Sequence, residues 1–118
     1  MKRVILDTNF LISLAEFKVD LDEIENILNE PYEILTISSV VDELKKINNK
    51  NARLALKLIE LKKVKILKVG EKNADKAILS LANKDTIIAT NDAELRKRLK
   101  TLNSKTIYLR AKKYLAID

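Results

Sequence analysis

The sequence has no cysteine and no histidine among its 118 residues. Without thiols, disulfide bonds, zinc–thiolate sites and cysteine nucleophiles are excluded. Without imidazole, the chain also lacks the commonest general base and metal ligand, so a Ser–His–Asp triad is impossible. If the chain is an enzyme, its chemistry must come from carboxylates, lysines, hydroxyl groups or a metal ion bound by oxygen ligands.

Glycine and proline are almost as scarce, since Gly70 and Pro31 are the only examples. This scarcity excludes glycine-rich phosphate-binding loops and leaves little room for hairpin turns. No linker or repeat divides the sequence, so we expect one domain over residues 1–118. No apolar run approaches the ~20 residues that span a bilayer, and no leader precedes the first strand-like segment. We therefore expect a cytoplasmic protein without a membrane partner.

The formal net charge of +6 is unevenly distributed along the chain. Acidic residues outnumber basic ones over residues 1–43, whereas basic residues dominate 44–72 and 91–118. This distribution indicates an anionic partner that binds beside a locally acidic site. It also fits lysines that only keep helix surfaces solvated, and charge alone does not decide between the two interpretations.

Short apolar segments alternate with amphipathic ones along the chain. The predicted strands cover residues 2–6, 33–37, 64–69, 86–89 and 106–109, and the predicted helices cover 9–17, 21–29, 40–48, 51–62, 73–83 and 92–101. This alternation predicts an α/β fold with a parallel sheet of about five strands covered by helices on both faces. Sites in such sheets lie beyond the carboxyl ends of the strands.

Two aspartates lie close behind predicted strands. Asp7 directly follows strand 2–6, and Asp92 comes shortly after strand 86–89. An aspartate in this position can also serve as the N-cap of the next helix, which stays an open alternative for Asp7. For Asp92 we predict that Asn91 is the cap, with Glu94 three residues later as its partner, so that Asp92 stays available.

Two further acids lie at the edges of apolar helix stripes. Glu43 flanks the stripe of helix 40–48, and Asp75 flanks that of helix 73–83, whereas Lys76 faces away. Taken singly, Glu43 is equally an ordinary boundary glutamate, and Asp75 an acid favoured by the helix dipole. Helix geometry nevertheless allows both to reach the sheet edge that carries Asp7.

Four carboxylates gathered at one edge repel one another unless a hard cation neutralises them. Oxygen ligands without histidine suit Mg²⁺ or Mn²⁺. The sequence therefore predicts a divalent-metal site formed by Asp7, Glu43, Asp75 and Asp92, of the kind that hydrolyses phosphodiesters.

The segments that contain these acids resemble, in order, the four motifs of the PIN domain family. They are residues 4–11 (VILDTNFL), 38–44 (SSVVDEL), 74–79 (ADKAIL) and 88–92 (IATND). Residues 92–99 and 106–110 resemble small single-domain archaeal PIN proteins, which are similar to the nuclease domains of eukaryotic rRNA-processing factors. The similarity to VapC-type toxin ribonucleases is looser in this region.

The resemblance implies a three-layer Rossmann-like fold and a Mg²⁺- or Mn²⁺-dependent endoribonuclease that prefers single-stranded RNA. It implies that the four acids are the catalytic metal ligands, with Asn9 and Thr90 as auxiliary contacts behind them. Lys76 departs from the pattern, because close relatives often carry a second acid there. This departure would lower the affinity for a second metal ion.

The chain also offers basic candidates for contacts to an RNA backbone, namely Lys45, Lys46, Arg96, Lys97 and Arg98. Each is equally explained as part of a solvated helix face. The family further implies partners: precursor rRNA, an antitoxin if the protein is a toxin, and a second copy in a homodimer.

Other functions compete with that of a nuclease. An RNA- or partner-binding scaffold with weak or no catalytic activity is the main alternative. A phospho-accepting receiver domain fits poorly, because no acceptor aspartate follows strand 64–69. A two-aspartate phosphatase needs a second aspartate after the first strand, and Asp7 is followed by Thr8 and Asn9 instead.

Overall fold

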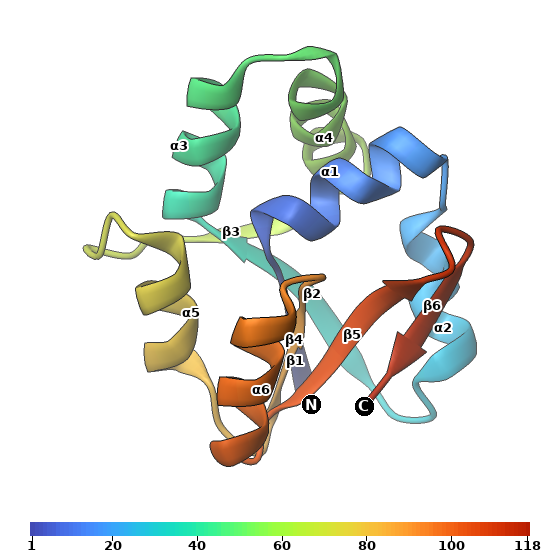
Figure 1. Ribbon diagram of the computed structural model, residues 1–118, viewed down its shortest axis with the longest axis vertical. Helices are drawn as coiled ribbons and strands as arrows, with labels where there is room; N and C mark the ends of the chain where they lie inside the picture. The colour runs from blue at the N-terminus through green and yellow to red at the C-terminus, as the bar shows by residue number, and fades with distance from the viewer.

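A six-stranded sheet forms the centre of the computed structural model, which describes all 118 residues (Figure 1). The strand order is β3–β2–β1–β4–β5–β6. The strands are β1 (Lys2–Leu6), β2 (Tyr32–Ile37), β3 (Lys65–Leu67), β4 (Thr86–Ala89), β5 (Lys105–Arg110) and β6 (Tyr114–Ile117). The first five run parallel to their neighbours, as the alternating sequence predicts, and β6 runs antiparallel to β5.

The two central strands are apolar because both faces of the sheet are covered. Val4, Ile5 and Leu6 of β1 are fully buried. The whole of β4 is also buried. Parallel strands buried on both faces read as continuous apolar runs. The short VIL and TIIA runs therefore mark the strands at the middle of the sheet.

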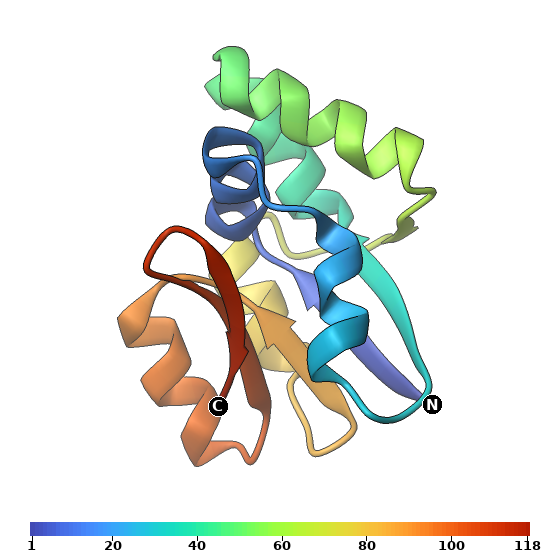
Figure 2. The ribbon, with the colours of Figure 1, turned by 90° about the vertical axis from the view of Figure 1, so that its right-hand side faces the viewer.

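Helices cover both faces of the sheet (Figures 1 and 2). They are α1 (Thr8–Phe17), α2 (Ile24–Ile27), α3 (Ser38–Ile47), α4 (Lys50–Leu61), α5 (Ala74–Leu81) and α6 (Ala93–Thr101). Helix α4 packs against α1 and α3, while α3 contacts both α1 and α5. None of these helices is long and apolar enough to cross a membrane.

The strand order reverses direction between β1 and β4. From β1 the chain moves outward through β2 to β3, then returns to β4 on the other side of β1 and continues to β5. Right-handed crossovers therefore place α1 and α2 on one face, and α5 and α6 on the other. The carboxyl ends of β1 and β4 lie at this reversal, which is where open α/β sheets leave a crevice for ligands.

The segment predicted as one helix over residues 21–29 is shorter and less regular. It consists of a 3₁₀ turn, η1 (Leu21–Glu23), followed by the single-turn α2. Asp20 caps the turn, because its Oδ1 accepts a hydrogen bond from the Asp22 N–H at 2.9 Å. Leu28 is already extended, and Pro31 disfavours helical backbone in the residue before it.

The sheet has one strand more than the sequence predicts. Residues 110–114 form a turn that brings β6 back against β5, although the segment contains no glycine. Instead Ala111 and Lys112 adopt left-handed backbone, with φ of 54° and 57°. A hairpin turn of this hand usually uses asparagine and glycine, so the sequence carries no turn signal. The expectation that scarce glycine leaves little room for hairpin turns does not hold for this segment.

The strained turn provides a test of the hairpin. Left-handed backbone costs a non-glycine residue about 1–2 kcal/mol, so Ala111→Asn combined with Lys112→Gly should raise the free energy of unfolding by about 1 kcal/mol. Urea denaturation measures the change. The same pair placed in helix α6, as Lys97→Asn with Arg98→Gly, should instead destabilise the protein by a similar amount. A hairpin variant less stable than the native protein would contradict the turn described here.

Candidate metal centre

The candidate site begins where β1 and β4 end. The two strands pair in parallel with Leu6 opposite Ala89, so Asp7 and Thr90 emerge side by side. The Asp7 N–H donates to the Ala89 carbonyl at 2.9 Å, which extends the ladder to the first residue of the site. The backbone register of the two strands thus brings together side chains more than eighty residues apart in sequence.

Asp7 is the most buried acid of the site, with 3% of its surface exposed. Its Oδ1 accepts a hydrogen bond from the Thr8 N–H at 2.8 Å, and its Oδ2 accepts one from the Thr90 hydroxyl at 2.7 Å. The residue is therefore the N-cap of α1 as well as a member of the site. A carboxylate oxygen has two lone pairs, so these bonds leave acceptor capacity for a cation.

Burial raises the pKa of the Asp7 carboxyl from 3.8 to about 6. The hydrogen bonds from Thr90 and Thr8 lower the pKa, and the negative charges of Asp75 and Glu43 raise it. Desolvation outweighs the hydrogen bonds, because the charged form loses water on burial. Asp7 is therefore an ionisable group held in an environment that would favour a bound cation.

Asp92 is the N-cap of α6, contrary to the prediction that Asn91 has this role. The Oδ1 of Asp92 accepts hydrogen bonds from the N–H groups of Glu94 and Leu95, at 2.9 and 3.2 Å. Asn91 instead donates to the Ser13 hydroxyl at 2.8 Å and accepts from the Leu109 N–H at 2.9 Å. Asn91 is therefore occupied by long-range contacts, and Asp92 has the cap and the pocket position together.

Thr90 and Asn9 link these elements behind the two aspartates. The Thr90 hydroxyl accepts from the Asp92 N–H at 3.2 Å while it donates to Asp7. Asn9 Oδ1 accepts a hydrogen bond from the Asn91 N–H at 3.0 Å. Both residues thus hold the loop after β4 against the start of α1.

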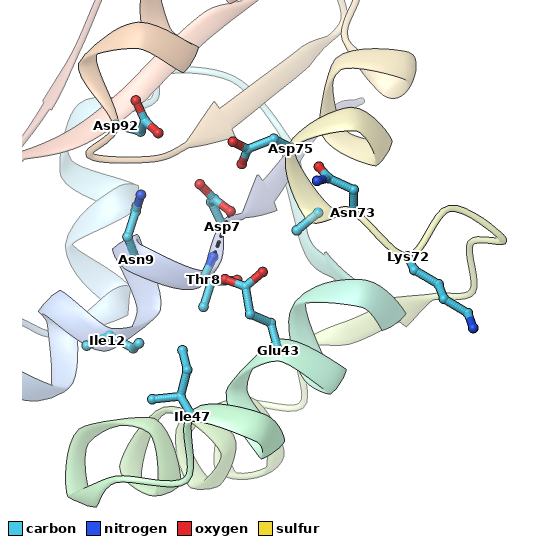
Figure 3. A pocket seen from close by; sticks show the side chains of 11 residues that line it. Asp7, Thr8, Asn9, Ile12, Glu43, Ile47, Lys72, Asn73, Asp75 and Asp92 are labelled. Atoms are coloured by element: carbon cyan, nitrogen blue, oxygen red, sulfur yellow. Dashed lines mark hydrogen bonds between the residues drawn. The ribbon is translucent and has the colours of Figure 1, made fainter.

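Glu43 and Asp75 approach from helices on opposite sides of Asp7. Figure 3 shows Glu43 on α3 and Asp75 on α5 with their carboxylates directed toward Asp7, while Asp92 lies above it. Both side chains are exposed and make no hydrogen bonds to other residues. The N-cap of α5 is Asn73, whose Oδ1 accepts from the Lys76 N–H at 3.0 Å. Asp75 is consequently not needed as the cap.

All four acids line one open pocket of about 460 Å³. Its remaining lining residues are Thr8, Asn9, Ile12, Ile47, Lys72, Asn73 and Ala74. No three of the acids stand close enough together to enclose a single ion as the side chains lie. The exposed Glu43 and Asp75 are the members free to adjust, since the buried Asp7 is held by hydrogen bonds at both oxygens.

The Thr8 hydroxyl is a further polar group beside the pocket. It is buried in the pocket wall and has no hydrogen-bond partner in the protein. A buried unpaired hydroxyl costs about 1–3 kcal/mol, and a ligand oxygen would offset that cost. With the all-oxygen set of carboxylates, this orphan hydroxyl fits a hydrated divalent cation.

Comparison with known proteins assigns the chain to a family. The family model described as a PIN-like domain matches residues 4–112. The chain belongs to this PIN-like domain family. Ribonuclease VapC4 of Methanocaldococcus jannaschii is 35% identical over an alignment 127 residues long, gaps included, which covers 99% of this chain and 97% of that protein.

Solved structures show the same PIN fold. The structure of the PIN domain endonuclease Utp24 superposes with a TM-score of 0.86 at 24% identity, over 98% of this chain and 90% of that one. The structure of VapBC-1 from nontypeable Haemophilus influenzae gives a TM-score of 0.52 at 16% identity, over 86% of this chain and 96% of that one. These two likenesses concern the fold alone.

The predicted basic residues of this PIN domain lie in different places. Lys45 and Lys46 line a second groove next to the acidic pocket. Arg96 is held elsewhere, because its Nη2 donates to Asp118 at 2.8 Å and its guanidinium lies 3.6 Å from the Tyr108 ring centroid. Arg96 therefore ties helix α6 to the C-terminal strand instead of facing the pocket.

Lys97 and Arg98 are exposed on α6 and do not line the pocket. Sequence reasoning also missed Thr8, Ile12, Ile47 and Lys72. The apolar spacing places Ile47 in the buried stripe of its helix, and the structure leaves it 41% exposed. Lys72 has no local motif, so only its position in the folded loop identifies it.

The raised pKa of Asp7 predicts how this PIN domain responds to pH. Because the folded pKa of about 6 lies above the unfolded value of 3.8, ionisation of Asp7 opposes folding. The protonated form of Asp7 contributes its full share to the free energy of unfolding below about pH 4. This contribution is lost as the pH rises through 6. Without divalent ions at pH 7.5, Asp7→Asn should raise the free energy of unfolding by up to about 3 kcal/mol.

Chemical denaturation in EDTA at pH 4 and pH 7.5 measures this difference. The advantage of Asp7→Asn over the native protein should nearly vanish at pH 4. Glu16→Gln, which removes an exposed carboxylate of α1, should change stability by less than about 0.5 kcal/mol at either pH. An equal advantage of Asp7→Asn at both pH values would contradict the role of burial.

Proposed function

We propose that this PIN domain is a cytoplasmic endoribonuclease that hydrolyses phosphodiester bonds of single-stranded RNA with Mg²⁺ or Mn²⁺. The observation that carries the proposal is the convergence of Asp7, Glu43, Asp75 and Asp92 on one pocket. The similarity to Ribonuclease VapC4 over nearly the whole chain supports RNA as the substrate.

Each residue of the pocket would have a distinct role in the reaction. Asp7 and Asp92 would hold the cation, because both are fixed by hydrogen bonds at strand ends. Glu43 and Asp75 would complete the ligand set and orient the attacking water. When bound, the cation activates that water and stabilises the charge that develops at the phosphate. Thr90 and Asn9 would keep the two aspartates in register.

Lysines near the pocket would hold the RNA backbone. Lys45 and Lys46 lie beside the acids in the adjoining groove. Phosphate contacts of this kind position a strand without reading its sequence. Lys97 and Arg98 would contribute only long-range attraction from α6, and Arg96 belongs to the contact with Asp118.

Macromolecular partners follow from the same proposal. Similarity to a VapC protein and to a VapBC structure supports an antitoxin as a partner. The resemblance to rRNA-processing nucleases supports precursor rRNA as a substrate instead. Helix α4 leaves Leu54 and Leu61 exposed, which offers apolar surface for a homodimer.

Cleavage of an unstructured RNA in Mn²⁺ tests the proposal. The native protein should cleave, EDTA should stop cleavage, and Asp7→Asn should reduce the rate by more than the ~100-fold that an outer contact costs. Circular dichroism must show that the variant is folded. Undiminished cleavage by folded Asp7→Asn would refute the assignment. Native protein that binds Mn²⁺ and RNA without cleaving would establish the scaffold function instead.

A second prediction concerns the orphan hydroxyl of Thr8. Thr8→Val keeps the shape of the side chain, so the metal-free protein should gain about 1 kcal/mol in the free energy of unfolding. Mn²⁺ affinity, measured by calorimetry, should fall by roughly tenfold, because an oxygen in the loaded pocket loses its donor. Thr101→Val, at an exposed position on α6, serves as the control. Unchanged Mn²⁺ affinity in Thr8→Val would exclude this role.

A further inference from the structure

The acidic pocket has an apolar side that metal binding does not require. Ile12 of α1 and Ile47 of α3 line it together. Figure 3 shows both side chains on the side of the acids away from Lys72. Ile47 is 41% exposed. We call Ile12 and Ile47 the isoleucine ledge.

The opposite side of the pocket carries Lys72. This lysine lies in the loop between β3 and α5, and the loop is pinned to the start of α3. The Ser38 hydroxyl accepts from the Val69 N–H at 2.9 Å, and the Ser39 hydroxyl donates to the Glu71 carbonyl at 2.7 Å. The backbone of Lys72 is thus fixed on one side by these serines. Asn73, on its other side, caps α5.

Lys72 also belongs to a second hollow that adjoins the acidic pocket. This groove, of about 500 Å³, is lined by Ser39, Asp42, Glu43, Lys45, Lys46 and Lys72, with no apolar residue. Glu43 and Lys72 are common to the groove and the pocket. None of the three lysines is within 4.0 Å of a carboxylate oxygen in an ion pair. Their charges are available to an anion.

We propose that single-stranded RNA crosses the pocket in one orientation, with a nucleobase on the isoleucine ledge and the next phosphates on Lys72, Lys45 and Lys46. The inference rests on the proposed function for the identity of the chain that is bound. The apolar ledge suits the face of a base, and the lysines on the other side suit phosphates. The carboxylates between the two sides would then face the sugar–phosphate linkage.

The composition of the ledge has a consequence for selectivity. Isoleucine side chains contact the face of any base, and they offer no hydrogen-bond donor or acceptor to read its edge. Lysines likewise contact phosphates without regard to sequence. The protein should therefore discriminate little between base sequences and prefer strands whose bases are unpaired.

Binding of fluorescein-labelled U10 and A10 RNA in EDTA tests this orientation without cleavage. Lys72→Ala should weaken binding about fivefold and reduce the slope of log Kd against log salt by about 0.7, the value for one phosphate contact on a single strand. Lys84→Ala, which removes an exposed lysine at the opposite end of the sheet, should leave that slope unchanged.

Two substitutions of Ile47, one expected to weaken RNA binding and one expected to tighten it, test the isoleucine ledge. Ile47→Ser should weaken binding of both RNAs several-fold with no change in salt slope. Ile47→Phe should tighten binding, more for A10 than for U10, because an aromatic ring stacks on the larger base. An RNA of the same length with abasic sites should be insensitive to both substitutions.

The outcomes separate this inference from the proposed function. If native protein binds RNA and the Lys72 and Ile47 variants bind with native affinity and salt slope, the orientation is wrong, whatever the cleavage assay shows. If the variants behave as expected and native protein with Mn²⁺ does not cleave, the orientation holds and the nuclease assignment fails. Native protein that binds neither RNA overturns the inference.

Discussion

The hydrogen bond from the Thr90 hydroxyl to Asp7 joins the two strand ends on which the site depends. It is possible because β1 and β4 are neighbours in register, which places the residues after Leu6 and Ala89 side by side. The same hydroxyl accepts from the Asp92 N–H. One threonine side chain therefore links Asp7, which follows β1, to the backbone of Asp92, which follows β4.

Burial of Asp7 connects the stability of the fold with its proposed chemistry. The carboxylate caps α1 and accepts a hydrogen bond from Thr90. Its pKa nevertheless stays raised, because desolvation raises the pKa more than these hydrogen bonds lower it. A carboxylate kept in such surroundings is costly to the empty protein and favourable to a cation. The unpaired hydroxyl of Thr8 adds to the same imbalance. The unfavourable surroundings of both groups are explained if the functional form of the protein has a cation in the pocket.

Charge is arranged so that attraction and repulsion act at adjacent places. A phosphate approaching the four acids is repelled, and Lys45, Lys46 and Lys72 line the adjoining groove, where they compensate this repulsion. This local alternation explains why an overall basic protein has an acidic centre. The similarity to Ribonuclease VapC4 agrees with a polyanionic substrate, which the proposed orientation places across both the acidic pocket and the basic groove.

The sequence by itself determined the order of helices and parallel strands, and it determined that acids follow β1 and β4, because hydrophobic periodicity and residue order are local properties. The tertiary structure decided what depends on distant partners. Asn91 is drawn away from capping by Ser13 and Leu109, and Arg96 is drawn from the surface by Asp118. The β5–β6 hairpin rests on pairing that compensates a turn without glycine. The lining of the pocket by Thr8, Ile47 and Lys72 likewise arises only when three separate segments fold together. Thr8 and Lys72 carry no local signal, and the apolar spacing of Ile47 predicts burial instead.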